Sequence, residues 1–332
     1  MITKAVTTTA TAHPNIALIK YWGDLDPALH IPTNGSISLN LRELSTRTSV
    51  SFDPSLNHDE FILDDRQIEG SSLERVSIFL DRVRQMAGIA KFASVKSHNN
   101  FPAGTGIASS ASGFAALSLA ASKAAGLALD ESTLSRLART GSGSACRSIP
   151  GGFVEWQAGS TDQDSYAHSL ASPEHWDLVD CIAVVSQEQK TVSSRQGHSL
   201  ARTSLLQSIR VDDAPRRLNI CRKAILQRDF DALADVVELD SNLMHAVMLT
   251  STPSLLYWEP PTLMIMQAIQ SWRKGGLPIC YTIDAGPNVH VLCTREYSRE
   301  IADRLQQLPG VLQLFIAHPG ESARLENNPL VL

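Results

Sequence analysis

The sequence lacks the features that place a chain in several common classes. It has no run of about 18 apolar residues, so no membrane span is expected. Its first fifteen residues contain no apolar segment typical of a secretory signal, which favours a cytoplasmic location. Its five cysteines are odd in number and form no Cys-x-x-Cys pair, so we expect reduced thiols and no zinc.

An excess of positive charge is also absent. The 332 residues include 29 Lys and Arg against 34 Asp and Glu, a formal net charge of −5. Proteins that bind nucleic acid by neutralising its phosphates need a basic surface, so nucleic acid is not an expected partner. An anionic small molecule must then be held by a few local Arg and Lys side chains and by backbone N–H groups.

Two standard phosphate-binding motifs are missing, yet residues 99–114, NNFPAGTGIASSASGF, still indicate a phosphate site. The segment has no Lys for a Walker-type loop, and Ser109 stands where the dinucleotide fingerprint needs a third Gly. Its glycines permit close approach of the backbone, and its serines open an apolar helix, where free N–H groups favour an anion. A plain N-capped helix after a loop has the same pattern, so the segment alone leaves both interpretations open.

The spacing of apolar residues predicts strands and helices in an irregular order. Strands are predicted over residues 36–41, 46–53, 60–65, 92–96, 151–156, 181–186 and 311–317. Residues 279–294 predict two strands joined by a hairpin turn at Ala-Gly-Pro-Asn. Helices are predicted over 73–87, with Ser71 or Ser72 as cap, and over 110–125, 130–140, 195–210, 214–228, 230–248, 260–274 and 298–307.

Because strands and helices mix without steady alternation, the sequence predicts an α+β fold. A boundary near residue 180 divides it into an N-terminal lobe with the phosphate loop, residues 1–180, and a C-terminal lobe, residues 181–332. No linker rich in Pro, Gly or Ser marks this boundary, so the lobes are expected to share an interface.

Four further segments combine Gly, Ser and charged residues in short stretches. They are residues 13–23, HPNIALIKYWG; 141–153, GSGSACRSIPGGF; 190–197, KTVSSRQG; and 282–288, TIDAGPN. With the phosphate loop, they resemble the mevalonate phosphate and diphosphate decarboxylases of the GHMP kinase superfamily. The matching motifs are NIA-x-IKYWG, PxxxGLASSAS with Ile107 in place of Leu, GSGSACRS, VSSR and DAGPN, in the family's order.

The resemblance implies a GHMP-type fold of two lobes, with mixed and antiparallel sheets, packed helices and an active site in the cleft between the lobes. It implies ATP and Mg²⁺ as cofactors, phosphorylated mevalonate as the small-molecule substrate, and a homodimer. The expected activity is ATP-dependent decarboxylation in isoprenoid biosynthesis.

The resemblance also implies roles for individual residues. The implied catalytic residues are Asp284, Lys20, Arg147 and Asn15, with Arg147 on the substrate C1 carboxylate and Asp284 beside the tertiary hydroxyl. Further substrate contacts are implied for Tyr21, Asp24, Ser142, Ser144, Ser194 and Arg195. The nucleotide is expected at Asn99, Pro102, Gly104, Gly106, Ala108, Ser109 and Ser110, with Ser110 also a ligand of Mg²⁺.

Each of these residues also has an ordinary structural interpretation. Most arginines are solvated or structural, an aspartate before a turn is usually a cap, and a lone strand lysine usually reaches the surface. Trp22, Trp156 and Trp258 are expected in the core. A non-catalytic nucleotide-binding module and an α+β domain without a site therefore remain alternatives, as does a GHMP kinase that phosphorylates mevalonate without decarboxylation.

The chain departs from the diphosphate enzymes at Asp24, because they typically have a second lysine there, in KYWGK. An acid beside a diphosphate adds like-charge repulsion, which favours the monophosphate as substrate. Residues 257–263, YWEPPTL, and 320–326, GESARLE, also resemble the archaeal-type phosphomevalonate decarboxylases. His198 stands where Met is common, which leaves that part of the pocket open. A diphosphomevalonate decarboxylase remains the alternative.

Overall fold

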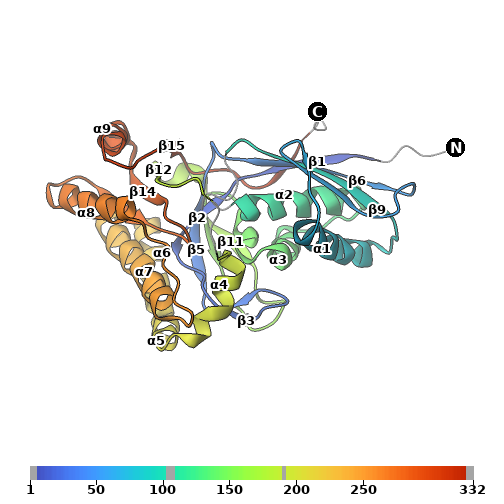
Figure 1. Ribbon diagram of the computed structural model, residues 1–332, viewed down its shortest axis with the longest axis horizontal. Helices are drawn as coiled ribbons and strands as arrows, with labels where there is room; N and C mark the ends of the chain where they lie inside the picture. The colour runs from blue at the N-terminus through green and yellow to red at the C-terminus, as the bar shows by residue number, and fades with distance from the viewer. Residues whose placement is uncertain (1–5, 102–108, 189–191, 327–332) are drawn as a thin grey trace.

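The structure, a computed structural model, describes residues 6–101, 109–188 and 192–326. Three helices of the first half cover a mixed sheet of six strands, of which five come from the first half and one, β16, from the end of the described chain (Figure 1). In spatial order these strands are β16 (Arg324–Glu326), β1 (Thr8–Ala12), β6 (Thr46–Asp53), β9 (Phe92–Asn99), β7 (Glu60–Leu63) and β8 (Arg66–Gln67). The helices are α1 (Ser71–Ala87), α2 (Ser109–Ala124) and α3 (Glu131–Gly141).

Helix α2 lies close against β1 and β6 because most of its buried side chains are Ala or Ser. Small side chains let the helix backbone approach the sheet, where Val50 and Val95 meet it in one apolar cluster. This packing fixes the N-terminal end of the helix, and with it Ser109 and Ser110.

A second sheet lies at the centre of the molecule. Its strands are β11 (Ala167–Ala171), β10 (Phe153–Trp156), β5 (Ser36–Asn40) and β2 (Asn15–Ile19). Every residue of β2, β5 and β10 is buried, since both faces of this sheet are covered. A small hairpin of β3 (Asp24–Asp26) and β4 (Ile31–Pro32) follows β2, and a 3-10 helix, η1 (Gly143–Ser148), precedes β10.

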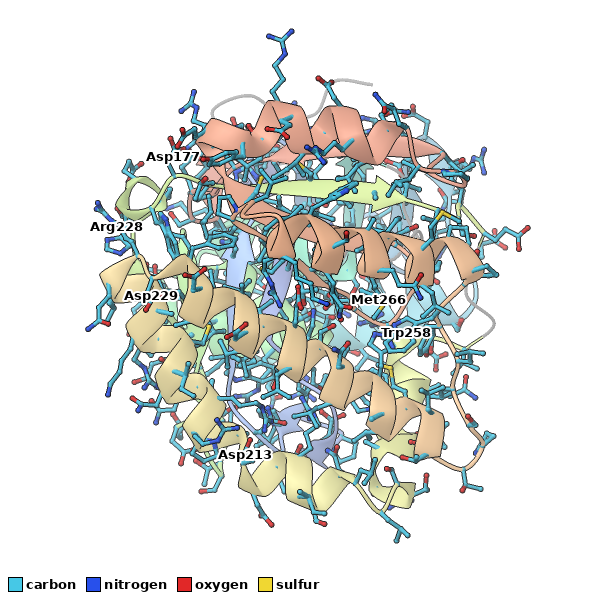
Figure 2. The ribbon with its side chains drawn as sticks, turned by 90° about the vertical axis from the view of Figure 1, so that its left-hand side faces the viewer. Asp177, Asp213, Arg228, Asp229, Trp258 and Met266 are labelled. Carbon is cyan, nitrogen blue, oxygen red and sulfur yellow. The ribbon has the colours of Figure 1, made fainter. Side chains whose placement is uncertain are left out.

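The second half is an antiparallel sheet with helices packed around it. Its strand order is β13 (Ile279–Thr282), β14 (Val289–Thr294), β12 (Leu178–Val184) and β15 (Gln313–Ala317). Helices α7 (Phe230–Thr250), α8 (Pro260–Lys274) and α9 (Arg295–Gln306) pack against this sheet. Helix α6 (Ala214–Gln227) packs against α7 and the central sheet, and two short helices, α4 (Ser194–Leu200) and α5 (Gln207–Asp212), precede it. Figure 2 looks onto this end, with α9 at the top, α8 and α7 across the middle and α5 near the bottom.

The two halves share one apolar core. Ile16 and Leu39 of the central sheet belong to the same buried cluster as Ile182 of β12, Ala224 of α6 and Val237 of α7. The division of the chain at residue 180 therefore stays a prediction.

The α+β architecture is confirmed, and most predicted elements agree with it to within a few residues. The helix predicted over 195–210 is wrong, because the chain forms α4, a short 3-10 helix over 201–203 and α5 instead. Ser204 causes the break, since its hydroxyl accepts the Leu206 N–H (3.2 Å) while its backbone is extended. The expected cap at Ser71 or Ser72 is also wrong, because α1 begins after Gly70 with no capping side chain.

The cysteines and most of the tryptophans named above lie in the interior. All five cysteines are buried and free. Trp22 and Trp156 are buried as expected, whereas Trp258 is only partly buried. Among the described residues, no helix is both long and apolar enough to cross a membrane.

Candidate active site

A cavity of about 440 Å³ opens between the two halves, and both contribute to its wall. From the first half come Lys20, Tyr21 and Asp24 after β2, the start of α2, and the turn that holds Ser142, Ser144 and Arg147. From the second half come Ser194, Arg195, His198 and Asp284. The geometry thus brings together residues that lie far apart in the sequence.

Lys20 and Asp284 form the central ion pair of this cavity. The Lys20 ammonium donates to Asp284 Oδ1 at 2.6 Å; the lysine side chain is 1% exposed and the aspartate 27%. Burial alone would raise the pKa of Asp284, but Lys20, with more distant His290 and Arg147, outweighs it and lowers that pKa. Asp284 is therefore an ionised acceptor, and its Oδ2 has no hydrogen-bond partner among the described residues.

Arg147 is buried at the base of the cavity in a fixed orientation. Its Nη1 donates to Ser36 Oγ at 2.6 Å and its Nε to Asn15 Oδ1 at 3.2 Å. Among the described residues Nη2 has no hydrogen-bond partner, so it can meet a carboxylate in the cavity. Asn15 in turn donates to Ser148 Oγ (2.8 Å) and the Ser144 carbonyl (3.1 Å). Asn15 thus contacts Arg147 but is not among the described residues that line the cavity, and its catalytic role stays a prediction.

Asp24 lies in the cavity wall among aromatic and imidazole rings. Its Oδ1 accepts a hydrogen bond from the Tyr21 hydroxyl, and its Oδ2 lies 3.8 Å from His30 Nδ1. Burial raises the pKa of Asp24, but His30, His198 and Tyr21 together overcome this and lower it. The cavity that Ser194 and Arg195 line thus also carries a negative charge in its wall, and the sequence led us to expect the phosphate end of the substrate at these two residues.

His198 packs in this wall as a neutral imidazole. Its ring centroid lies 4.1 Å from that of Tyr21 and 4.5 Å from that of Trp22. Its Nδ1 accepts the Gly23 N–H at 3.0 Å, which requires an unprotonated nitrogen. Burial is the main cause that lowers the pKa of His198 to about 4.

We expect His198→Gln to make stability less dependent on pH. As the pH falls from about 6.5 towards 4, the unfolded chain binds a proton at this histidine while the folded chain does not, so the free energy of unfolding falls. Glutamine does not titrate, and it retains an acceptor oxygen. Urea midpoints at pH 7, 6 and 5 measure the effect, with the exposed His58→Gln as control. An equal fall in His198→Gln and the wild type would contradict this explanation.

The start of α2 also contributes to the wall of the cavity. Ser109 and Ser110 line it, and Ser110 Oγ lies 3.3 Å from Ser142 Oγ. Asn99, in contrast, does not line the cavity: it accepts from Thr46 Oγ1 at 2.6 Å and joins β9 to β6. Its nucleotide role stays a prediction. Four other residues predicted there, Pro102, Gly104, Gly106 and Ala108, lie outside the described residues.

Arg75 also lines the cavity, although no sequence motif indicates it. It belongs to an ordinary amphipathic helix, α1, where an arginine is unremarkable. Its Nη2 and Nε donate to the Gly141 carbonyl at 2.6 and 3.1 Å, and its guanidinium lies 4.6 Å from the centre of the Phe114 ring. Burial lowers the pKa of Arg75 to about 10, and Arg195 contributes to this. Arg75 therefore adds a cation beside the serines.

Comparison with known proteins identifies the family. Residues 12–167 match the model of the diphosphomevalonate decarboxylase-like N-terminal domain, and residues 181–317 that of the mevalonate 5-diphosphate decarboxylase C-terminal domain. Diphosphomevalonate decarboxylase of Ganoderma lucidum is 38% identical over 320 residues, covering 89% of this chain and 80% of that protein. Phosphomevalonate decarboxylase of Haloferax volcanii is 31% identical over 301 residues, covering 90% of each.

Solved structures agree with this assignment. Mevalonate diphosphate decarboxylase from Staphylococcus aureus has 39% identity and a TM-score of 0.94, covering 98% of this chain and 99% of that one. The fold and cleft therefore define an enzyme of the GHMP kinase superfamily. Within it, the chain belongs to the mevalonate phosphate and diphosphate decarboxylase family, which confirms the resemblance and makes it an ATP-dependent carboxy-lyase.

Proposed function

We propose that this enzyme converts mevalonate 5-phosphate and ATP to isopentenyl phosphate, ADP, phosphate and CO₂. The observation that carries the choice of the monophosphate is the Asp24 carboxylate in the cavity wall. The similar proteins of Ganoderma lucidum and Candida albicans are named diphosphomevalonate decarboxylases, and the similar protein of Haloferax volcanii is named a phosphomevalonate decarboxylase. Proteins of both names match most of this chain, so we expect a few side chains at the phosphate end to distinguish the two substrates.

The balance of charge in the cavity supports this choice. Among the described lining residues, Lys20 is paired with Asp284, and Arg147 is assigned to the C1 carboxylate. Arg75 and Arg195 are then the remaining cations for the phosphates of ATP and of the phosphorylated mevalonate. Asp24 opposes them, and each further negative charge on the substrate makes its repulsion larger.

The chemistry follows from the positions of three side chains. Asp284 accepts a hydrogen bond from the substrate C3 hydroxyl and takes its proton as the oxygen–phosphorus bond forms. Lys20 stabilises negative charge on the transferred phosphoryl group. Arg147 holds the C1 carboxylate so that the C1–C2 bond is anti to the C3–O bond. Loss of CO₂ then leaves an electron pair that forms the C2–C3 double bond, while phosphate departs from C3.

The donor set fits Mg²⁺ carried by the nucleotide. The described residues contain no cluster of three or more His, Cys, Asp or Glu side chains able to enclose a metal ion. Mg²⁺ bound to ATP needs only one or two protein ligands, because phosphates and water supply the rest. Ser110 Oγ would be such a ligand. The solved structure of MDDEF in complex with MVAPP, AMPPCP and magnesium, which is 37% identical to this chain, supports ATP and Mg²⁺ here.

One assay tests the proposal. The purified protein is given ATP, Mg²⁺ and mevalonate, its 5-phosphate or its 5-diphosphate, and both ADP and CO₂ are followed. We expect equal amounts of ADP and CO₂, fastest with the 5-phosphate. ADP without CO₂ would indicate a kinase, and neither product a binding module. The homodimer and the cytoplasmic location stay predictions, and sedimentation of the purified protein tests the first.

We expect Asp24→Asn to move preference towards the diphosphate. The substitution removes one negative charge, and at about 4 Å a unit charge is worth roughly 1 to 4 kcal/mol. The ratio of kcat/KM for diphosphate over monophosphate should rise at least about fivefold, most clearly at low salt. Asp26→Asn is the matched control, because Asp26 lies on the same strand and caps the Ala28 and Leu29 N–H groups outside the cavity.

An unchanged ratio in Asp24→Asn would show that this carboxylate does not act on the substrate's phosphate end. A wild-type enzyme that already prefers the diphosphate would overturn the monophosphate proposal and leave the family assignment intact.

A further inference from the structure

The two partners of the central ion pair follow strand ends, where the sheet no longer fixes the backbone. Lys20 comes directly after β2, and Asp284 follows β13 after one intervening residue, Ile283. They are 264 residues apart in the sequence, yet their side chains meet at 2.6 Å. Some other part of the fold must therefore hold both backbones in place.

Helix α7 contacts both backbones with polar side chains. Asp240 Oδ2 accepts the Lys20 N–H at 2.6 Å. Ser241 Oγ accepts the Ile283 N–H at 3.0 Å and lies 3.4 Å from the Ile283 carbonyl oxygen. His245 Nε2 lies 3.3 Å from that same oxygen. Ser241 and His245 are one turn apart on the helix, so both reach the carbonyl of the Ile283–Asp284 peptide group. Asp240 reaches the N–H of the Ile19–Lys20 peptide group.

Asp240 and Ser241 are buried, and the charge of Asp240 is paired. Asp240 and Ser241 have no exposed surface. A buried carboxylate needs an opposite charge, and Arg217 supplies it by donating from Nε to Asp240 Oδ1 at 2.7 Å. On the other side of Lys20, Arg210 Nη2 donates to the Lys20 carbonyl at 2.7 Å. Both peptide groups that flank the Lys20 Cα are thus fixed by charged side chains of the second half.

We propose that α7 acts as a positioning element for the reaction, and that Asp240 and Ser241 are positioning residues that set the separation of Lys20 and Asp284. The inference rests on the proposed function, in which this pair faces the reacting hydroxyl and phosphoryl group. Neither Asp240 nor Ser241 touches the substrate. Asp240 acts through the backbone of Lys20, and Ser241 acts through the backbone of Ile283, the residue before Asp284. Small misplacements of reacting groups lower rates strongly.

Ser241→Ala tests this proposal with little change of volume. It removes the acceptor of the Ile283 N–H, one residue before Asp284. We expect kcat to fall roughly 10- to 100-fold, because a displacement near 1 Å costs about 10²-fold, while KM stays within about threefold. Ser251→Ala is the control: Ser251 lies at the end of the same helix and is buried, and among the described residues its hydroxyl donates only to the Val247 carbonyl of that helix, at 2.8 Å. It should lower the melting temperature without lowering kcat.

A double-mutant cycle separates positioning from general loosening of the fold. If Ser241 acts through Asp284, Ser241→Ala should lower kcat much less in an Asp284→Asn background than in the wild type. Equal losses in both backgrounds, or wild-type kcat in Ser241→Ala, would overturn the positioning role. Should Ser241→Ala fail to fold, Ser241→Cys takes its place in the same cycle. Full activity of Asp284→Asn alone would instead contradict the proposed function.

Discussion

Asp284→Asn is expected to lower kcat by about 10²- to 10⁴-fold, the range typical of one positioned acid or base. The Asp284 carboxylate is 27% exposed. It is ionised because Lys20, at 2.6 Å, lowers its pKa. Asparagine keeps the size of the side chain but cannot take a proton from the hydroxyl. It also leaves the buried Lys20 ammonium without its counter-ion.

The measurement follows ADP and CO₂ together with the binding of ATP. We expect ATP binding to remain, since the serines at the start of α2 are unchanged. Asp59→Asn is the matched control: Asp59 is also a carboxylate paired with a buried cation, Arg84 at 2.9 Å, but it lies outside the cavity. It should cost stability and retain kcat. More than half of wild-type turnover in Asp284→Asn would remove Asp284 from the mechanism.

The sequence predicted those parts of the fold that follow from local patterns. Helix α8, over Pro260–Lys274, and helix α3, capped by Asp130 through the Thr133 N–H at 2.8 Å, agree with prediction because spacing and capping are read within one segment. The break at Ser204 was missed because its hydroxyl also meets Thr250 Oγ1 at 2.6 Å, 46 residues away. A helical pattern cannot reveal a competitor that tertiary packing provides.

The site was predicted to a similar extent. Motif resemblance named Lys20 and Asp284, and the structure brings them together. It could not reveal Arg75, whose neighbours in α1 form an ordinary surface pattern, nor Asp240, which reads as one more acidic residue on a long helix. Their roles depend on the other elements that they touch. The polar groups that orient a site are therefore harder to predict than the groups that enter it.

Substitution of Arg147 is expected to have the second large effect on activity. The orientation of its guanidinium is fixed on two sides. Ser36 and Asn15 hold Nη1 and Nε, the side chain is buried, and the Trp156 ring centre lies 5.8 Å from the guanidinium. A structural arginine would have its donors used within the protein. In Arg147, Nη2 lacks a partner among the described residues, and it belongs to a side chain that lines the cavity. A carboxylate there would complete its hydrogen bonds.

Arg147→Lys is therefore expected to harm decarboxylation more than folding. Lysine keeps the charge but loses the planar fork, so the C1 carboxylate loses a charge-assisted hydrogen bond worth about 1.5 to 3 kcal/mol, roughly 10- to 100-fold in kcat/KM. Arg139→Lys is the matched control, since Arg139 is equally buried but bonds Asp162 and the Leu29 carbonyl outside the cavity. Both variants should lower the melting temperature. If Arg147→Lys keeps the turnover of its folded fraction, Arg147 only supports the fold, because one lysine ammonium cannot keep the bonds to Ser36 and Asn15 and also reach a carboxylate as Nη2 does.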